Sequence, residues 1–265
     1  MTEVVVTTWG AGMPIHLGLK AAHSVTPGET LHVYVGGGRN STTPGFNGGG
    51  TGVVLSVDPV PGFPDFVKGT HGAGASDVRQ GGTSLSKRIQ VTPGAGGWGI
   101  YEISSVPGYY GIESLSPGGG VGSYSGPNSS SGGGVGATAP ASYPGIYELD
   151  PLAGYTGTSW AGAGGGGYVG GDSGEVEWRW STMFPGSVLV TPTLGRPGTF
   201  YVAPTGTVIY PEFGYFGWYR DDIPEGGVYQ WGADGRVDID WVPGEPENGW
   251  HVGRLGMGSG AWTPA

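Results

Sequence analysis

Histidine, aspartate and serine, the side chains of a hydrolytic triad, occur here in two short motifs. His23 lies in the string AAHS and Ser173 in the string GDSG. A histidine beside a serine hydroxyl can accept its proton, and an aspartate can orient that histidine. Asp58 or Asp77 could complete the set. The chemistry would be acyl transfer to water.

The context of these motifs differs from that of the trypsin-like serine proteases, to which they are similar in residue type and order. His23 comes too early in the chain for the strands that precede the histidine in that family. The string EVE follows at 175–177, where the family has a further glycine and a proline. Because a motif needs its structural context, we predict that the chain is not an enzyme and keep the protease as a third hypothesis.

Carboxylates and glycines supply two further patterns. Asp234, Asp238 and Asp240 could offer oxygen ligands to calcium, but the last two alternate along a predicted strand, where solvated carboxylates are ordinary. The five histidines show no spacing typical of a metal site. Residues 162–167 satisfy GxGxxG, yet no buried strand precedes them and no helix can follow. We predict neither a metal nor a cofactor.

Large aromatic side chains are the best candidates for a binding surface. Flat rings on rigid strands suit a sugar face or a protein partner, although any single ring on a strand can equally fill a core. The candidates are Trp178, Trp180, Phe213, Tyr215, Phe216, Trp218, Tyr219 and Trp231. Eight such rings in this region exceed what one small core needs.

Composition narrows the function further. The chain has 265 residues with Gly 60 and Pro 22, yet Trp 10 and Tyr 14 argue against disorder. The net charge is -10, and the longest basic run is Lys87-Arg88. A nucleic-acid binder needs a basic stripe, so we expect no nucleic-acid partner. There is no cysteine, which removes disulfides and thiolate chemistry.

The elements that must carry these residues are strands and glycine runs. A strand is predicted to begin at Val4, Val5 and Val6, and a turn is predicted at residues 26–29. The alternation of apolar and polar residues at 31–35 predicts a half-buried strand. Between 36 and 174 short glycine islands exclude helix, because each glycine costs a helix about 1 kcal/mol. The islands are either flexible linkers or a packed bundle of polyglycine-II helices, three residues per turn. The aromatics between them favour the bundle.

Three regions follow from this pattern. Residues 1–174 form a predicted glycine-rich domain with N-terminal strands, residues 175–242 a β module with a closing strand, and residues 243–265 an extended tail. The start lacks the features of a signal peptide, and no stretch is long and apolar enough to span a membrane. We therefore expect neither.

Several strings resemble the glycine-rich domain of bacteriophage tail proteins, bacterial surface proteins and anaplastic-lymphoma-kinase-type receptor ectodomains. They occur in that domain's order and span most of residues 1–242, although 175–230 has no obvious counterpart. The strings are EVVVTTWGAG at 3–12, TPGETLHVYVGGG at 26–38, GFNGGG at 45–50, GAGASDVR at 72–79, RIQVTPGAGG at 88–97, AGAGGGGYVGG at 161–171 and GRVDIDW at 235–241.

The resemblance implies an all-β fold in which antiparallel strands frame a polyglycine-II bundle, with essentially no α-helix. It also implies that Asp77 and Arg79 pair to fix a turn, which is a structural role. The usage of glycine, alanine and tryptophan suits a host with a high-GC genome, such as an actinobacterium. By resemblance, the expected protein is a minor tail protein of a phage tail tip.

Such a protein would act in the virion, with other tail proteins and a host-surface glycan or protein as partners, and form a homo-oligomer such as a trimer. The alternative is a cell-surface or secreted adhesion protein outside any virion. Loss of activity in Ser173→Ala would support the protease instead.

Overall fold

Strands make up almost all of the regular structure. The computed structural model describes residues 2–12, 16–38, 43–55, 68–69, 71–103, 110–113, 143–150, 153–174, 176–180, 188–192, 195–214, 234–241 and 258–262. In these ranges the only helix is a 3-10 turn, η1 (Leu85–Lys87). The all-β prediction is confirmed there. No helix in the described part is long and apolar enough to cross a membrane.

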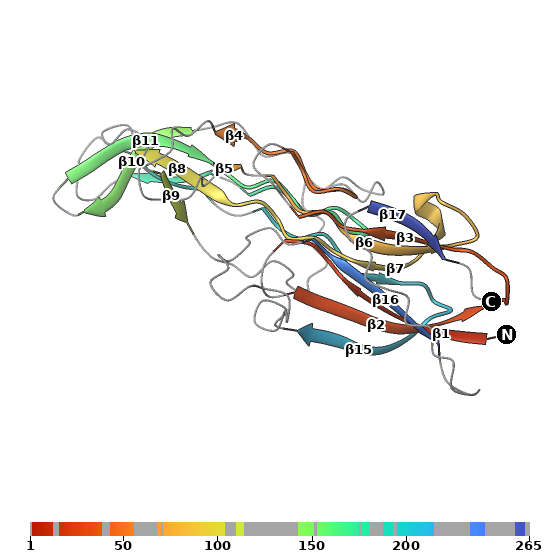
Figure 1. The fold of residues 1–265 in the computed structure, drawn as a ribbon. Coiled ribbons are helices and arrows are strands. Elements are labelled where there is room, and N and C mark those ends of the chain that lie inside the picture. Colours follow the sequence, from red (N-terminus) through yellow and green to blue (C-terminus); the bar gives the residue numbers. More distant parts are fainter. Residues whose placement is uncertain are drawn as a thin grey trace, which may run out of the picture.

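Two antiparallel sheets form a sandwich at one end of the elongated molecule (Figure 1). The four-stranded sheet has the order β15 (Thr207–Gly214), β2 (His16–Val25), β1 (Thr2–Trp9) and β16 (Arg236–Trp241). The five-stranded sheet has the order β14 (Tyr201–Val202), β7 (Arg88–Thr92), β6 (Ser76–Gln80), β3 (Leu31–Val35) and β17 (Gly258–Trp262).

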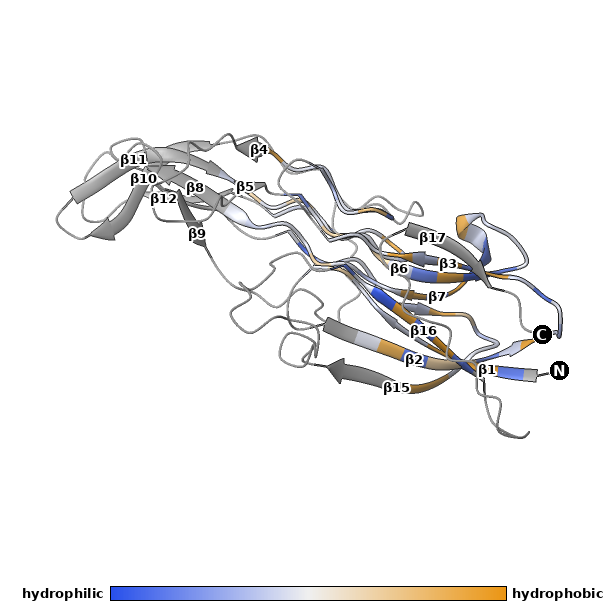
Figure 2. Ribbon diagram, viewed as in Figure 1, coloured by the Kyte–Doolittle hydropathy of each residue, from blue (hydrophilic) through white to orange (hydrophobic). Residues whose placement is uncertain are grey.

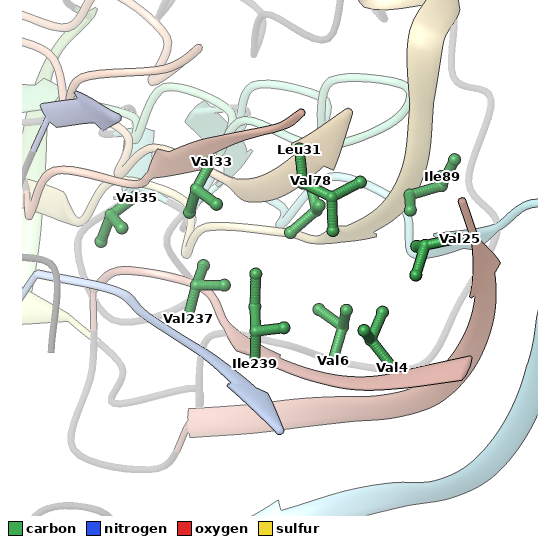
Figure 3. Close-up of a cluster of buried hydrophobic side chains, with 10 residues drawn as sticks. All are labelled: Val4, Val6, Val25, Leu31, Val33, Val35, Val78, Ile89, Val237 and Ile239. Carbon is green, nitrogen blue, oxygen red and sulfur yellow. The ribbon is translucent and has the colours of Figure 1, made fainter. Parts of the chain in front are cut away.

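The hydrophobic core lies between these two sheets, and Figure 3 shows its side chains directed at one another. On β3 burial alternates, with Leu31, Val33 and Val35 buried and the residues between them half-buried. This is the half-buried strand that the sequence predicts. The facing sheet contributes Val4, Val6, Val25, Val237 and Ile239, and β6 and β7 add Val78 and Ile89.

A six-stranded sheet lies at the opposite end (Figure 1). Its order is β12 (Val176–Trp180), β13 (Val188–Pro192), β10 (Tyr143–Asp150), β11 (Ala153–Trp160), β8 (Gly99–Ile103) and β9 (Tyr110–Glu113). Its strands pair antiparallel except β10 with β13, which are parallel. A short antiparallel pair joins β4 (Val54–Leu55) to β5 (Lys68–Gly69).

Extended glycine-rich segments connect the two ends and run side by side along the molecule (Figure 1). In Figure 2 these segments are mostly pale, between the hydrophilic and hydrophobic extremes, because glycine has an intermediate hydropathy. Apart from an isolated bridge at Gly12 they have no strand pairing, yet their backbones hydrogen-bond to one another. The segments are 10–12, 36–38, 43–50, 71–75, 93–98, 161–174, 195–198 and 234–235. We call this assembly the glycine bundle.

The hydrogen bonds of the glycine bundle alternate between neighbours with a period of three residues. The consecutive amides of Gly72, Ala73, Gly74 and Ala75 donate, in order, to segments 43–50, 93–98, 36–38 and again 43–50. Likewise Gly94 and Gly97 both donate to segment 161–174, whereas Ala95 between them donates to segment 10–12. A period of three is what polyglycine-II geometry requires. The helix type itself stays a prediction, whereas the lateral bonding is observed.

Glycine is required in the bundle because backbone packs directly on backbone. A Cβ at Gly74 would lie under 3.0 Å from the carbonyl group of Phe46, and one at Gly195 equally close to the carbonyl of Ala163. Where the segments leave more room, three alanines pack as a small apolar cluster, formed by Ala11, Ala73 and Ala95. The glycine islands are therefore packed structure in the described segments, and the flexible-linker alternative is wrong for them.

The sheets do not follow the predicted division of the chain at 174 and 242. β15 pairs with β2 and β16 pairs with β1, so these two strands complete an N-terminal sheet rather than a module within 175–242. β17 lies within the predicted tail and pairs with β3. Local patterns indicate where strands occur, whereas these pairings join segments far apart in sequence.

Candidate functional site

The predicted aromatic surface is not one surface in the structure. Trp178 and Trp180 lie on β12, at an edge of the six-stranded sheet, opposite Val190 and Val188 of β13. Phe213 lies on β15 in the sandwich, at the other end of the molecule (Figure 1). The other candidates fall outside the described residues: Tyr215, Phe216, Trp218, Tyr219 and Trp231.

Asp77 and Arg79 do lie together, as the resemblance implies. They are two apart on β6, so they share a face of the strand. Arg79 Nε donates to Asp77 Oδ1 at 2.6 Å and Nη2 donates to Asp77 Oδ2 at 3.0 Å, with both side chains buried. The guanidinium lies 3.6 Å from the ring centroid of Tyr34, and Nη1 donates to the carbonyl of Thr83.

The same carboxylate holds a turn of the glycine bundle. Asn47 Nδ2 donates to Asp77 Oδ2 at 2.8 Å and to the carbonyl of Ala75 at 2.7 Å. Asn47 has a positive φ of 64°, a conformation that asparagine tolerates better than most residues. The buried pair therefore fixes the turn around Asn47 against β6, and all of its contacts are structural.

A second arginine supports a pair of stacked tyrosines. The rings of Tyr168 and Tyr201 are parallel within 9°, with centroids 3.9 Å apart. The Arg88 guanidinium lies 4.6 Å from the Tyr168 centroid. Burial and the neighbouring phenol of Tyr168 raise the pKa of Tyr201. Burial lowers the pKa of Arg88, and its negatively charged neighbour Asp77 partly opposes that shift.

Backbone bonds hold both tyrosines in place. Arg88 donates to the carbonyls of Leu85, Gly167 and Tyr168, at 2.9, 3.0 and 3.1 Å. The amide of Tyr168 donates to Thr199 O, and Thr199 N donates to Val169 O, both at 2.9 Å. Val169 N also donates to Thr199 Oγ1. We call Arg88, Tyr168 and Tyr201 the tyrosine stack.

Sequence reasoning missed the tyrosine stack. Arg88 stands out in the sequence only as part of the longest basic run, and Tyr168 only as a tyrosine within a glycine segment. One signal could have found it: Tyr168 is a bulky ring in a glycine run whose tight packing leaves no room for side chains. Such a ring must lie at the surface of the bundle or in a gap.

No protein-family model matches the chain, and no curated protein matches it.

The residues of the hydrolytic hypothesis make other contacts. His23 is buried on β2, and its Nε2 lies 2.8 Å from Gln90 Oε1. Gln90 Nε2 then donates to Thr8 Oγ1 and to the carbonyls of Val6 and Leu19, so these groups form one buried polar network. Ser173 lies in the glycine bundle beside Asp172, whose carbonyl accepts from Arg196 N. Asp58 is outside the described residues.

Two of the three aspartates weighed as calcium ligands, Asp234 and Asp238, have separate structural contacts. Asp234 Oδ1 accepts from the amide of Gly38 at 2.8 Å. Asp238 forms an ion pair with Arg236, at 2.6 Å between Oδ2 and Nη2. Among the described residues no group of three or more His, Cys, Asp or Glu is arranged to hold a metal ion. The glycines of the GxGxxG pattern at 162–167 lie in the bundle, where they pack on other backbone segments.

Two buried histidines make stability depend on pH. Burial lowers the pKa of His23 and of His71 below the ordinary value of 6.5, although a hydrogen bond to Gln90 and the charge of Glu3 partly oppose this at His23. His71 Nδ1 accepts from the amide of Gly52 at 2.8 Å, and its buried Nε2 has no hydrogen-bond partner. Burial therefore favours the neutral form of both rings in the folded state.

We expect the protein to melt at a lower temperature as the pH falls below 6.5. The unfolded chain binds protons there while the folded chain does not, so stability is complete above that pH and is lost as pH falls toward the lowered pKa values. The test is thermal unfolding by circular dichroism between pH 8 and about pH 5. His71→Asn keeps an acceptor for Gly52 N and should reduce the slope. An unchanged slope would contradict this assignment for His71.

Proposed function

We propose that this chain is a structural and receptor-binding subunit of a bacteriophage tail tip, a minor tail protein. Its partners would be other tail proteins, further copies of itself, as in a trimer, and a glycan or protein on the host surface. The order of the glycine-rich strings along the sequence supports the tail-protein assignment.

The glycine bundle is the observation that carries the proposal. Segments from eight parts of the chain pack backbone on backbone between a β-sandwich and a six-stranded sheet, giving an elongated body. Such packing needs no large hydrophobic interior, because the backbones of the bundle segments pack on and hydrogen-bond to one another. A body of this kind suits a particle component that must hold a binding end away from its attachment point.

The binding end in this proposal is the six-stranded sheet. β12 is an edge strand of that sheet and carries Trp178 and Trp180, two members of the predicted aromatic set. The sandwich at the other end would then face the rest of the tail. Aromatic residues of this kind commonly dominate the energy of binding surfaces.

The experiment is binding of the purified protein to cells of candidate actinobacterial hosts, together with antibody labelling of virions. We expect saturable binding and label at one end of the tail. Trp178→Ala or Trp218→Ala should weaken binding by about 30-fold if the ring is a hot spot. Trp98→Ala, which changes a tryptophan of the glycine bundle, is the matched control, with folding of each variant checked by circular dichroism.

Labelled tails without cell binding by folded protein would contradict the attachment role and leave tail assembly as the function. Absence of the protein from virions would contradict the tail assignment, and cell binding in that case would favour the adhesion protein.

A further inference from the structure

The tyrosine stack ends at the protein surface. Tyr168 and Tyr201 are both half-buried, and Tyr201 lies on β14, the edge strand of the five-stranded sheet. Arg88, in contrast, is buried. The stack therefore runs from a buried cation outward to a ring that is partly in solvent.

The order within the stack follows from its distances. Tyr201 covers one face of Tyr168 at a centroid distance of 3.9 Å, which leaves no room on that face for another group. The Arg88 guanidinium, 4.6 Å from the Tyr168 centroid, must therefore cover the opposite face. The column runs Arg88, Tyr168, Tyr201, and Tyr201, the half-buried ring at its outer end, has one face that Tyr168 does not cover.

The stack is held rigidly before any ligand arrives. Each of the three nitrogens of the Arg88 guanidinium donates to a carbonyl group, so this arginine is held in place against Tyr168. Both tyrosines belong to segments joined through Thr199. A ring that is already fixed loses little conformational entropy on binding, which favours affinity.

We propose that the outer face of Tyr201 is a stacking platform for one sugar ring of a surface glycan. A pyranose presents a face of C–H groups that packs flat on an aromatic ring, while its hydroxyl groups can bond to the phenols at the rim. This proposal rests on the proposed function for its glycan ligand, and it places a second binding surface on the sandwich, away from the six-stranded sheet.

A sugar fits this surface better than the other ligand classes. A protein partner would bury about 800 Å² of this chain, but the exposed large hydrophobic residues of the described part are few and lie in three separate places: Phe46 in a turn, Leu85 on η1, and Val208 with Ile209 on β15. A nucleic acid would meet a net charge of -10, which repels its phosphates.

The test is saturation-transfer difference NMR of the purified protein with methyl glycosides of glucose, galactose, mannose and N-acetylglucosamine. We expect transfer to the ring protons of at least one glycoside. Tyr201→Ala should weaken that binding by about tenfold or more, whereas Tyr201→Phe, which keeps the ring, should retain most of it. Phe200→Ala removes the neighbouring ring and is the matched control, since it should leave binding unchanged.

Lack of transfer from the folded protein to all four glycosides would overturn the proposal, and so would binding that survives in Tyr201→Ala. Each result is independent of virion labelling. A labelled tail without glycoside binding would therefore reject the platform and leave the tail assignment standing.

Discussion

Replacing Gly74 by alanine is expected to lower the free energy of unfolding by about 4 kcal/mol or more. The new Cβ would lie under 3.0 Å from the carbonyl carbon and oxygen of Phe46, which are backbone atoms and cannot rotate away. Moving them apart would strain two hydrogen bonds, Gly37 N to Phe46 O at 3.0 Å and Gly74 N to Gly37 O at 2.9 Å. For a chain of this size the melting temperature should fall by roughly 8 °C or more.

The measurement is thermal unfolding by circular dichroism, with Gly81→Ala as the matched control. Gly81 has a φ of 72°, and a Cβ there would meet no heavy atom within 4 Å. Alanine at this position therefore costs only backbone strain of about 1–2 kcal/mol. If the two variants melted at the same temperature, the direct backbone packing at Gly74 would be contradicted.

Removing Asp77 is expected to destabilise the protein by about 3–5 kcal/mol. Asp77→Ala leaves the buried Arg79 guanidinium without its two carboxylate bonds, and it also takes an acceptor from Asn47. A buried charge without a partner is costly because it has lost its hydration. Urea unfolding of Asp77→Ala, of Arg79→Leu and of the double variant would measure the coupling between the two residues.

Asp238→Ala is the control for this measurement. Its pair with Arg236 has the same spacing of two residues, but the side chains are 40% and 22% exposed, against 7% and 2% for the Arg79–Asp77 pair. An exposed ion pair contributes about 1 kcal/mol or less. Equal losses in Asp77→Ala and Asp238→Ala would show that burial of the Asp77 pair has no special effect.

Residues with side chains gave reliable local predictions. The alternation of β3 and that of β16 each place apolar residues in the core, and a hydrogen bond from Glu29 N to Thr26 O closes the predicted turn, with Gly28 at a φ of 82°. These features depend only on neighbours along the chain. The Asp77 and Arg79 pair is implied by the resemblance alone, and in the structure it too joins near neighbours on one strand.

Relations between distant segments could not be predicted in the same way. Glycine has no side chain to specify a neighbour, so nothing in segment 71–75 indicates that it bonds to segments 36–38 and 93–98. For the same reason Tyr168 and Tyr201 show no sign in the sequence of meeting each other. The aromatic pattern has the opposite fault. It groups Trp178 and Phe213 into one predicted binding surface, whereas these residues belong to different sheets.

The period of three in the glycine bundle has a mechanical consequence. Because successive amides of segment 71–75 donate in different directions, this segment is cross-linked to several neighbours instead of to one strand on either side. The segments run along the long axis, so a pull between the two ends would load these lateral bonds in shear and all together (Figure 1). Stretching the molecule would then require many bonds to break at once, whereas peeling one segment sideways would break them in sequence.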